Sequence, residues 1–374
     1  MKKIAKLILS LSLTAVAAGG IIGVGVVLNS KSAANGVDSF KGYVSDIVFD
    51  TKEQTARNYV EKEFSSETKS TEFINFEKIS NLSRDDIDRM GVLSLTDKEI
   101  IDGEEVNIKF SRGGQILNAK ACIFNTGFGY IYYVPPVETG GLIPNTYFDY
   151  IFNKENYLNS TYDCTVNMRT ISEEATNDSI YHQQIYFADK KAYFDQDLPG
   201  LTNDFYFEEK DGRIISYLKH PNKKDGKFYS LSEINNSLSP GLYYKVYLLK
   251  GNEQVDIAGL TKMDEIISFM FSMNLDSSFF VKTDRGFSMT DDRYKDVCKN
   301  LIGSASTNKE IDEAWDTYQV HFRGDYYVNE DRLSAYQIVL TMVNNDTIYA
   351  LEIKSEFSNF GTTEIEMPYE KEGA

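Results

Sequence analysis

Residues 162–169 read Tyr-Asp-Cys-Thr-Val-Asn-Met-Arg, and this stretch decides the fold. Tyr162, Cys164, Val166 and Met168 are largely apolar, whereas every residue between them is polar. Side chains of a β-strand point alternately to opposite faces, so this strand has one apolar face and one wet face. Sheets with one solvated face are usually antiparallel. The stretch therefore predicts an antiparallel sheet that is covered on one side.

The same pattern continues from about residue 157 as a long antiparallel meander. Asp211-Gly212 and Asp225-Gly226 separate apolar runs, and such two-residue turns are a strong hairpin signal. Helical periodicity interrupts the strands at residues 257–273 and 291–301. The predicted closing strands are residues 315–327, 336–342, 347–357 and 362–367, with a tight turn at 344–346.

A smaller α+β unit is predicted ahead of the meander. Residues 40–49 favour a strand or an extended lead-in. Asp50 and Glu53 match the capping box of a helix over residues 51–64, whose apolar residues recur at helical spacing.

A second, shorter helix in this unit is expected to start at Ser83 and to bury Ile87, Met90 and Leu93. Four strands should follow it. Asp102-Gly103 predicts a hairpin turn between residues 99–101 and 106–110, and residues 115–124 and 130–134 are the next strands.

The first 36 residues predict export across a membrane. Three lysines precede an uncharged run from Leu7 to Leu28, which as a helix would span roughly 33 Å, close to the hydrocarbon thickness of a bilayer. The run is longer than the apolar core of a usual secretory signal, which favours a retained anchor. Cleavage before Asn35, with release of the protein, stays an alternative. We expect an extracytoplasmic protein that is anchored to the cell membrane, or secreted if it is cleaved there.

Three regions follow from these patterns. They are a signal or transmembrane segment with its linker (1–36), the N-terminal α+β unit (37–150) and the antiparallel β unit with helices (151–374). The fold class is therefore α+β, dominated by antiparallel sheet.

Charge and cysteine content exclude some functions. The net charge of −17 at pH 7 argues against nucleic acid as a partner, because phosphates require clustered lysine and arginine. Cys122, Cys164 and Cys298 lack metal-ligand spacing, so we expect small buried side chains. A Cys122–Cys164 disulfide is the alternative.

No motif predicts catalysis. The three histidines, His182, His220 and His321, lack the neighbours of a metal site, and neither a nucleophile elbow nor a phosphate-binding loop occurs. We therefore expect a protein that is not an enzyme, with no catalytic residue, no metal site and no cofactor. Residues 323–325, Arg-Gly-Asp, are expected to mark a turn between two strands rather than an adhesion site.

The second half resembles the LolA and LppX/LprG-like bacterial carriers of lipids and lipoproteins. The resemblance rests on the succession of amphipathic strands, on two helices before the last strands, and on the ending. That ending comprises residues 350–353 (Ala-Leu-Glu-Ile), 357–361 (Phe-Ser-Asn-Phe-Gly) and 364–368 (Glu-Ile-Glu-Met-Pro). It implies a half-open, barrel-like sheet whose concave side covers a lipid or another hydrophobic ligand. Relatives with an attached lipid carry it on an N-terminal cysteine, which this chain lacks.

The candidate ligand-lining residues lie on the apolar faces of the predicted strands and of the helix at 257–273. They are Val166, Met168, Phe207, Ile214, Leu218, Met263, Ile267, Met270, Ile338, Leu340, Met342, Leu351 and Ile353. A second interpretation is that these side chains simply pack beneath that helix, as in any core.

Two functions remain open at this point. The first is an exported, membrane-anchored, non-enzymatic protein that binds a lipid or another hydrophobic ligand. The alternative is a cell-envelope scaffold or interaction module that binds a protein or a wall polymer. The sequence identifies no protein partner.

One basic segment stands out in this acidic chain. Lys219, His220, Lys223, Lys224 and Lys227 surround the Asp225-Gly226 turn. They predict either a solvated hairpin tip or a contact with anionic lipid headgroups or wall polymer.

Overall fold

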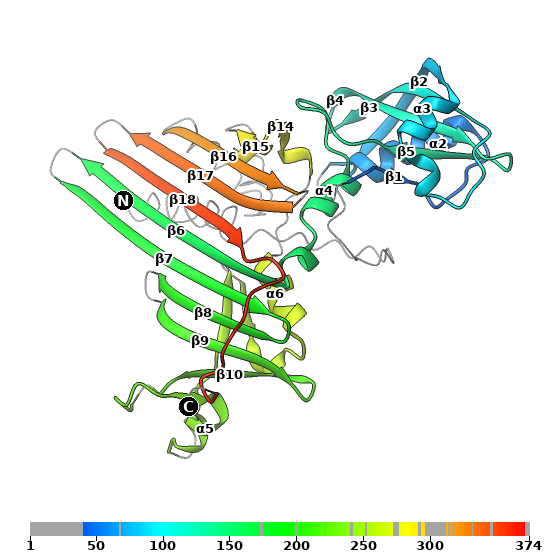
Figure 1. Ribbon diagram of the computed structural model, residues 1–374. Coiled ribbons are helices and arrows are strands. Elements are labelled where there is room, and N and C mark those ends of the chain that lie inside the picture. Colours follow the sequence, from blue (N-terminus) through cyan, green and yellow to red (C-terminus); the bar gives the residue numbers. More distant parts are fainter. Residues whose placement is uncertain are drawn as a thin grey trace.

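The computed structural model shows two antiparallel sheets joined by a short helix (Figure 1). It describes residues 40–66, 69–172, 175–198, 201–220, 222–239, 242–250, 253–271, 277–290, 293–295, 312, 315, 318–330, 332–344 and 347–370. The predicted membrane segment, Cys298, most of the predicted helix at 291–301 and two residues of the predicted turn at 344–346 lie outside these residues. None of the helices in the described ranges is long and apolar enough to cross a membrane.

The small sheet has five strands in the order β1-β5-β4-β3-β2. Their bounds are Tyr43–Val44 (β1), Thr71–Leu82 (β2), Asp102–Arg112 (β3), Gln115–Asn125 (β4) and Tyr130–Val134 (β5). Helix α2 (Lys52–Phe64) packs on one face, where Tyr59, Val60 and Phe64 are buried. The expected N-cap, Asp50, is wrong by one residue. Thr51 caps the helix, because its hydroxyl and the Gln54 side chain satisfy each other's backbone amides.

The second predicted helix is confirmed as α3 (Arg84–Arg89), which Ser83 caps, and it is followed by the 3₁₀ turn η1 (Val92–Ser94). Ile87 is buried, but Leu93 is exposed, so that part of the prediction is wrong. The chain leaves the α-helix at Met90, and the tighter turn that follows buries Val92 in place of Leu93.

The predicted turn at Asp102-Gly103 is wrong. Both residues lie inside β3, where Gly103 pairs with Phe124 of β4. A Cβ atom at position 103 would lie only 2.5 Å from the Phe124 ring. Glycine is therefore required here for close packing between strands rather than for a turn.

β2 is the outer strand of the small sheet, and it is irregular. The ladder between β2 and β3 shifts register between Phe73 and Asn75 and again between Lys78 and Ser80. The extra residues, Ile74 and Ile79, are both exposed. β2 is thus a twice-bulged edge.

The large sheet has eleven strands in the order β11-β10-β9-β8-β7-β6-β18-β17-β16-β15-β14. β6 to β9 span Asn159–Ser172, Thr176–Ala188, Lys191–Leu198 and Leu201–Lys210, and β10 and β11 span Arg213–Lys219 and Phe228–Ser230. β14 to β18 span Val281–Thr283, Gly286–Thr290, Gln319–Asn329, Arg332–Asn344 and Thr347–Ser358. A separate hairpin of β12 (Tyr247–Lys250) and β13 (Glu253–Asp256) lies beside it. The antiparallel meander is confirmed, and the sheet is open.

Local turn chemistry in the large sheet is partly as predicted. Asp211 and Gly212, both at positive φ, form the two-residue turn between β9 and β10. The turn expected at residues 323–325 is wrong, because these residues lie inside β16 and pair with both β15 and β17. The rings of Tyr326 and Phe322 flank Gly324, and residues 322–326 pair without a break with Leu340 to Tyr336 of β17.

The strand expected at residues 362–367 is absent from this described part of the chain. Hydrogen bonds with side chains, rather than backbone pairing with another strand, hold this segment. The Thr363 amide donates to the Asn159 carboxamide at 2.8 Å, and Lys191 donates to the carbonyl of Ile365 at 3.4 Å.

The predicted helix over residues 257–273 begins later than expected. A 3₁₀ turn, η3 (Ile257–Gly259), comes first, and the α-helix α6 spans Met263–Phe271. Asp256 caps η3, and the carbonyl of Leu260 accepts a hydrogen bond from the amide of Ile214 in β10. Because the Leu260 carbonyl is hydrogen-bonded to a strand, residues 260–262 are not part of the α-helix.

Helix α4 (Asn145–Ile151) joins the two sheets. Its aromatic side packs in the large core, where Phe148 contacts Phe280 and Phe287. Its polar start faces α2, because the Asn145 carboxamide donates to the carbonyls of Lys62 and Ser65. A further 3₁₀ turn, η2 (Lys154–Tyr157), leads into β6.

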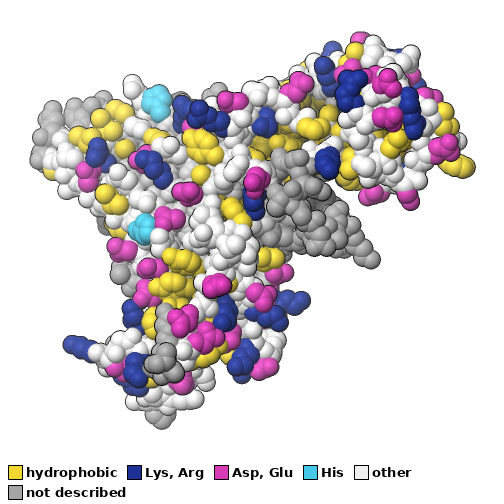
Figure 2. All heavy atoms as spheres, viewed as in Figure 1, with side chains coloured by type: hydrophobic (Ala, Val, Ile, Leu, Met, Phe, Trp, Pro, Cys, Tyr) yellow, Lys and Arg dark blue, Asp and Glu magenta, His cyan; other side chains and the backbone are white. Residues whose placement is uncertain are grey.

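The free end of the small sheet carries an exposed apolar cluster, here called the apolar tip (Ile47, Val48, Ile101 and Phe128). Ile101 packs beside Gly127, and Val48 packs beside Gly129, on either side of Phe128. Phe128 is 95% exposed. Figure 2 shows apolar side chains at this end of the molecule with acidic side chains among them.

The two described cysteines are free and buried. Cys122 belongs to the core of the small sheet and Cys164 to the core of the large sheet. The alternative of a Cys122–Cys164 disulfide is therefore wrong, and the prediction of small buried side chains holds for both.

Candidate functional site: the inner face of the large sheet

The strand register brings six of the predicted lining residues into two neighbouring rows. In one row Val166 lies opposite Ile353, which lies opposite Ile338. In the next row Met168, Leu351 and Leu340 are aligned in the same way. We call this side of the sheet, which also carries Tyr162 and Cys164, the inner face. The other side carries polar residues such as Asp163 and Glu352.

A second group of predicted lining residues lies several strands away, near α6. It comprises Phe207, Ile214 and Leu218 on β9 and β10, with Met263 and Ile267 on the helix. The amide of Met263 donates to the Glu209 carboxylate at 2.9 Å, which fixes the start of α6 against β9. The structure therefore places eleven of the thirteen candidate residues in two groups. Met342, two residues after Leu340 on β17, lies opposite Tyr349.

Most of the candidate residues are buried in the core. The buried ones are Val166, Phe207, Ile214, Met263, Ile267, Ile338, Leu340, Met342, Leu351 and Ile353. Leu218 is partly buried against the same core, Met168 is exposed, and the side chain of Met270 lies outside the described part of the structure.

The cover of the inner face ends along β6. The exposed fraction is 3% at Cys164, 8% at Val166 and 38% at Met168. Tyr181, the partner of Val166 on β7, is also only partly buried. The inner face thus passes from packed core to solvent within one strand, and we call Met168 and Tyr181 the open stretch.

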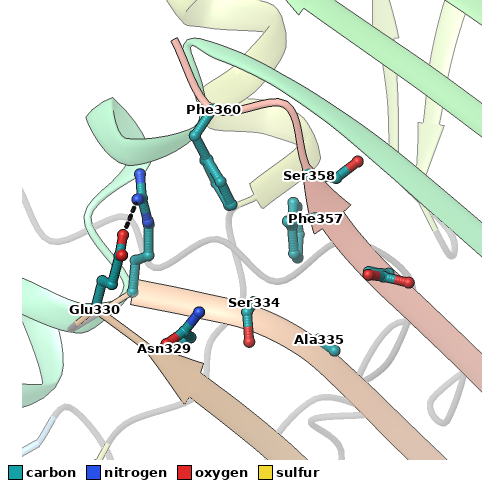
Figure 3. A pocket seen from close by; sticks show the side chains of 9 residues that line it. Asn329, Glu330, Ser334, Ala335, Phe357, Ser358 and Phe360 are labelled. Atoms are coloured by element: carbon teal, nitrogen blue, oxygen red, sulfur yellow. Dashed lines mark hydrogen bonds and ion pairs between the residues drawn. The ribbon is translucent and has the colours of Figure 1, made fainter. Parts of the chain in front are cut away.

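A cavity of about 370 Å³ lies beside the end of β18 and the β16–β17 hairpin (Figure 3). Its lining residues are Asn329, Glu330, Arg332, Ser334, Ala335, Glu356, Phe357, Ser358 and Phe360. Arg332 donates to Glu330 at 2.7 Å, and its guanidinium carbon lies 4.1 Å from the centre of the Phe360 ring. This mostly polar lining does not suit an acyl chain.

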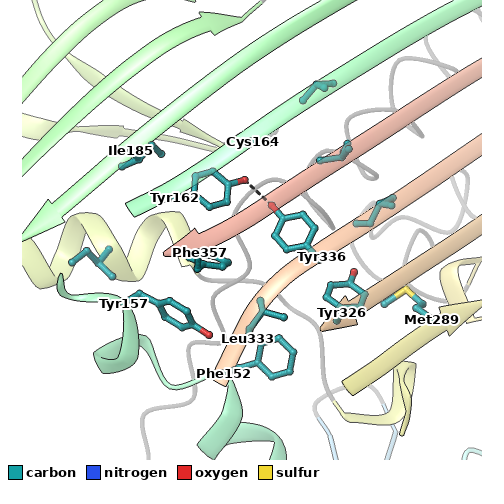
Figure 4. Packing of buried hydrophobic residues seen from close by; sticks show 14 of the residues in the cluster. Phe152, Tyr157, Tyr162, Cys164, Ile185, Met289, Tyr326, Leu333, Tyr336 and Phe357 are labelled. Carbon is teal, nitrogen blue, oxygen red and sulfur yellow. Dashed lines mark hydrogen bonds between the residues drawn. The ribbon is translucent and has the colours of Figure 1, made fainter. Parts of the chain in front are cut away.

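A buried polar group crosses the inner face beside the apolar rows. The hydroxyls of Tyr162 and Tyr336 lie 2.6 Å apart (Figure 4). Tyr162 also lies 3.2 Å from the Ser355 hydroxyl. Burial raises the pKa of Tyr162 well above its ordinary value, so the group stays neutral. The sequence analysis missed this network because it depends on the register of three strands.

A second polar group, also missed, lies between the two sheets. The buried Glu63 of α2 accepts hydrogen bonds from the amide and hydroxyl of Thr146, both at 2.9 Å, and from Tyr132 at 3.3 Å. Burial raises the pKa of Glu63 despite these donors. Burial, with the nearby charge of Glu63, also raises the pKa of Asp149 to about 6. This joint therefore contains two carboxyl groups that disfavour charge.

Two of the described histidines, His182 and His220, make ordinary hydrogen-bonding contacts. His182 lies 3.2 Å from the Asp163 carboxylate, and His220 lies 3.0 Å from the Ser237 hydroxyl. In the part of the chain that the structure describes, no three His, Cys, Asp or Glu side chains are grouped to hold a metal ion.

Comparison with known sequences gives one distant relative and no family. No family model matches the chain. An alignment of 157 residues, with 24% identity, relates it to the uncharacterized protein MG414 of Mycoplasma genitalium. That alignment covers 39% of this chain and 14% of the length of that protein.

The solved structures that are similar to this chain include the following three. An outer membrane lipoprotein-sorting protein domain from Vibrio parahaemolyticus has 10% identity and a TM-score of 0.19, over 57% of this chain and 90% of that chain. A LolA superfamily protein from Nitrosomonas europaea has 11% identity and a TM-score of 0.17, over 62% of this chain and 96% of that chain. Transferrin binding protein B from serogroup B Neisseria meningitidis has 6% identity and a TM-score of 0.17, over 70% of this chain and 34% of that chain. The predicted resemblance to LolA-like proteins is thus matched by solved structures only at this low level of similarity, which carries no argument about fold or function.

Proposed function

We propose that this protein is an exported, membrane-anchored, non-enzymatic protein that binds a lipid or another hydrophobic ligand on the inner face of its large sheet. The sheet would give the ligand a half-open, barrel-like enclosure, and residues 7–28 would hold the chain at the membrane. The proposal rests on the open stretch, where an apolar row that is packed at Leu340 and Leu351 continues to the exposed Met168.

The chemistry of the open stretch suits an acyl chain. Methionine has a flexible thioether that adapts to ligands of different shape. Tyr181 offers a ring surface with a hydroxyl that can meet a polar headgroup. Each buried methylene gains about 0.8 kcal/mol, so a chain of roughly ten methylenes that is only partly buried would still bind measurably.

Native mass spectrometry of the purified protein, followed by lipid extraction, tests the proposal directly. We expect a co-purified lipid that leaves on extraction. Binding of a fluorescent fatty acyl probe should then be lost in Met168→Trp, because the larger ring fills the open stretch.

Ile180 offers the matched control. It lies on β7 directly after Ser179, the partner of Met168, and it is 67% exposed. It shares the outer face with Asn167, its own partner on β6. Ile180→Trp should bind the probe as the unmodified protein does. If the unmodified protein carries no lipid and binds no probe, the proposal fails.

The apolar tip favours the second candidate function, an envelope scaffold. Exposed apolar clusters with a polar rim mark protein contacts, and a large aromatic side chain such as Phe128 is a typical anchor. A photo-activated side chain at position 128 should then give one discrete cross-linked product in whole cells. The same group at position 180 should give none, and a diffuse or absent product at position 128 would contradict the scaffold function.

A further inference from the structure

Helix α5 (Leu231–Asn236) lies at the end of the large sheet near β10 (Figure 1). The sequence around this helix differs in charge from the rest of the chain. Residues 219–247 contain five lysines against one aspartate and one glutamate, within a chain of net charge −17. We call the turn 219–227 and the segment 242–247 together the basic corner.

Helix α5 fixes the two parts of the basic corner together. The His220 ring, in the turn, lies 3.0 Å from the Ser237 hydroxyl at the end of the helix. The Asn235 side chain accepts from the amide of Tyr244 at 2.7 Å and donates to its carbonyl at 3.1 Å. The lysine turn and the aromatic segment therefore form one surface rather than two independent loops.

Four carboxylates lie near this surface, and each has a local partner. Asp204 pairs with Lys219, and Asp256 pairs with Lys245 at 2.8 Å. Asp225 accepts from the Tyr229 hydroxyl at 2.6 Å and from the amide of Lys227, and Glu233 caps its own helix through Ser230. Counted over its own residues, the segment 219–247 has a net charge of +3, from five lysines less one aspartate and one glutamate.

Lys223, Lys224 and Lys227 are all exposed. The ammonium group of Lys223 lies 4.1 Å from the centre of the Tyr229 ring, which orients it on the surface. The alkyl chains of these three lysines can lie along an apolar interface while their ammonium groups reach anionic headgroups.

The segment beside them exposes large apolar side chains. Leu242 is 64% exposed and Tyr243 is 68% exposed, and Tyr244 and Tyr247 are exposed as well. Tyrosine with leucine and lysine is the combination that settles at the boundary between lipid headgroups and acyl chains.

We propose that the basic corner docks on an anionic lipid bilayer, with Leu242 and Tyr243 entering the interface and Lys223, Lys224 and Lys227 meeting the lipid phosphates. This contact does not depend on whether the inner face binds a ligand. An anionic wall polymer would also attract the lysines, but it would leave Leu242 exposed to water, so the bilayer accounts for more of the surface.

The apolar tip at the other end of the molecule provides a matched contrast. Phe128 is even more exposed than Tyr243, but its surroundings carry Asp46, Asp50 and Asp102, which are all exposed. Carboxylates repel anionic lipid, so the same experiment should give no signal there.

The test uses the full chain with an environment-sensitive dye on Tyr243→Cys. It is mixed with vesicles of phosphatidylcholine, with or without phosphatidylglycerol. We expect the dye emission to rise and shift to shorter wavelength only with phosphatidylglycerol, and lipids with a quencher on the acyl chain should reduce it. The same dye on Phe128→Cys should not respond, and the chain without a substitution gives the background from its own cysteines.

Changing Lys223, Lys224 and Lys227 to glutamine should lower the ratio of docked to free corner about fivefold for each lysine, roughly a hundredfold in all. Leu242→Ser should make the segment enter the bilayer less deeply, so the quencher on the acyl chain should reduce the dye emission less. Equal emission from Tyr243→Cys in both kinds of vesicle would overturn the proposal. So would the same response to soluble polyphosphate without phosphatidylglycerol, which would assign the corner to an anionic polymer.

Discussion

The small sheet is covered on both faces, whereas the large sheet is covered mainly on one. In β5 four consecutive residues, Ile131 to Val134, are buried, two against α2 and two against the cluster around Ile87 and Val92. In β18 buried and accessible residues alternate from Leu351 to Phe357. A short continuous apolar run thus marks a strand between two layers, and alternation marks a strand at the edge of a core. The large sheet therefore has one apolar face whose cover can end within a strand, as it does at Met168.

The largest effect is expected where the inner face is fully packed. Leu340→Ala should lower the free energy of unfolding by about 2–5 kcal/mol. Leu340 is buried between neighbours on two strands, so the smaller side chain would leave a cavity. Denaturant unfolding measures this free energy. Ile180→Ala, on the solvated face, should change the free energy of unfolding by less than about 0.5 kcal/mol. Equal losses of unfolding free energy in the two variants would mean that the inner and outer faces of the sheet are equally buried.

Two tryptophan substitutions separate the packed and open parts of the same face. Met342→Trp should destabilise the fold by about 1–3 kcal/mol, because Met342 is buried and the core must shift. Met168→Trp should change stability by less than about 0.5 kcal/mol, since Met168 is exposed. Thermal unfolding of both variants gives the comparison, and a destabilised Met168→Trp would show that the inner face is closed there.

The joint between the sheets should respond to pH. The pKa of Asp149 is raised from its ordinary value of 3.8 to about 6, so the protonated form favours the folded state. Its stabilising contribution is complete below about pH 3.8 and is lost as the pH rises through about 6. Asp149→Asn should therefore stabilise the protein at about pH 7.5, by on the order of 1–3 kcal/mol, and flatten the pH dependence of Tm. Asp85→Asn, at an exposed position on α3, should leave the profile unchanged, and an unaltered profile in Asp149→Asn would contradict the assignment.

The smallest effect concerns the start of α2. Thr51→Ala should cost about 1 kcal/mol, because it removes the hydroxyl that caps the Gln54 amide. Asp50→Ala, one residue earlier, should cost less than about 0.5 kcal/mol. Urea unfolding of both variants decides which residue is the N-cap. If Asp50→Ala destabilised the protein more than Thr51→Ala, Asp50 would be the N-cap instead.

The sequence predicted the strands of the large sheet well because their two faces have different surroundings. Alternation at residues 162–169 identifies both the strand and its buried side without reference to any other strand. The errors arose where a distant contact overrides a local signal. Phe124 requires Gly103 inside a strand, and the hydrogen bond between Ile214 and Leu260 unwinds the start of a predicted helix.

The candidate site was predictable only as a set of residue types. Val166, Ile353 and Ile338 could each be assigned to an apolar face, but their alignment in one row depends on the register of three strands. The contact between the hydroxyls of Tyr162 and Tyr336 and the burial of Glu63 against Thr146 join residues far apart in the chain. No local pattern encodes such pairs.

The twice-bulged edge of the small sheet has a consequence for self-association. A straight, exposed edge strand offers a row of free amides and carbonyls on which another copy can add a strand, and this is a route to fibrils. At Ile74 and Ile79 the ladder of β2 loses its register, so an incoming strand could pair over only a few residues. In the described part of the large sheet, the two edges, β11 and β14, are three residues long. Two open sheets can therefore remain in one chain without serving as templates for aggregation.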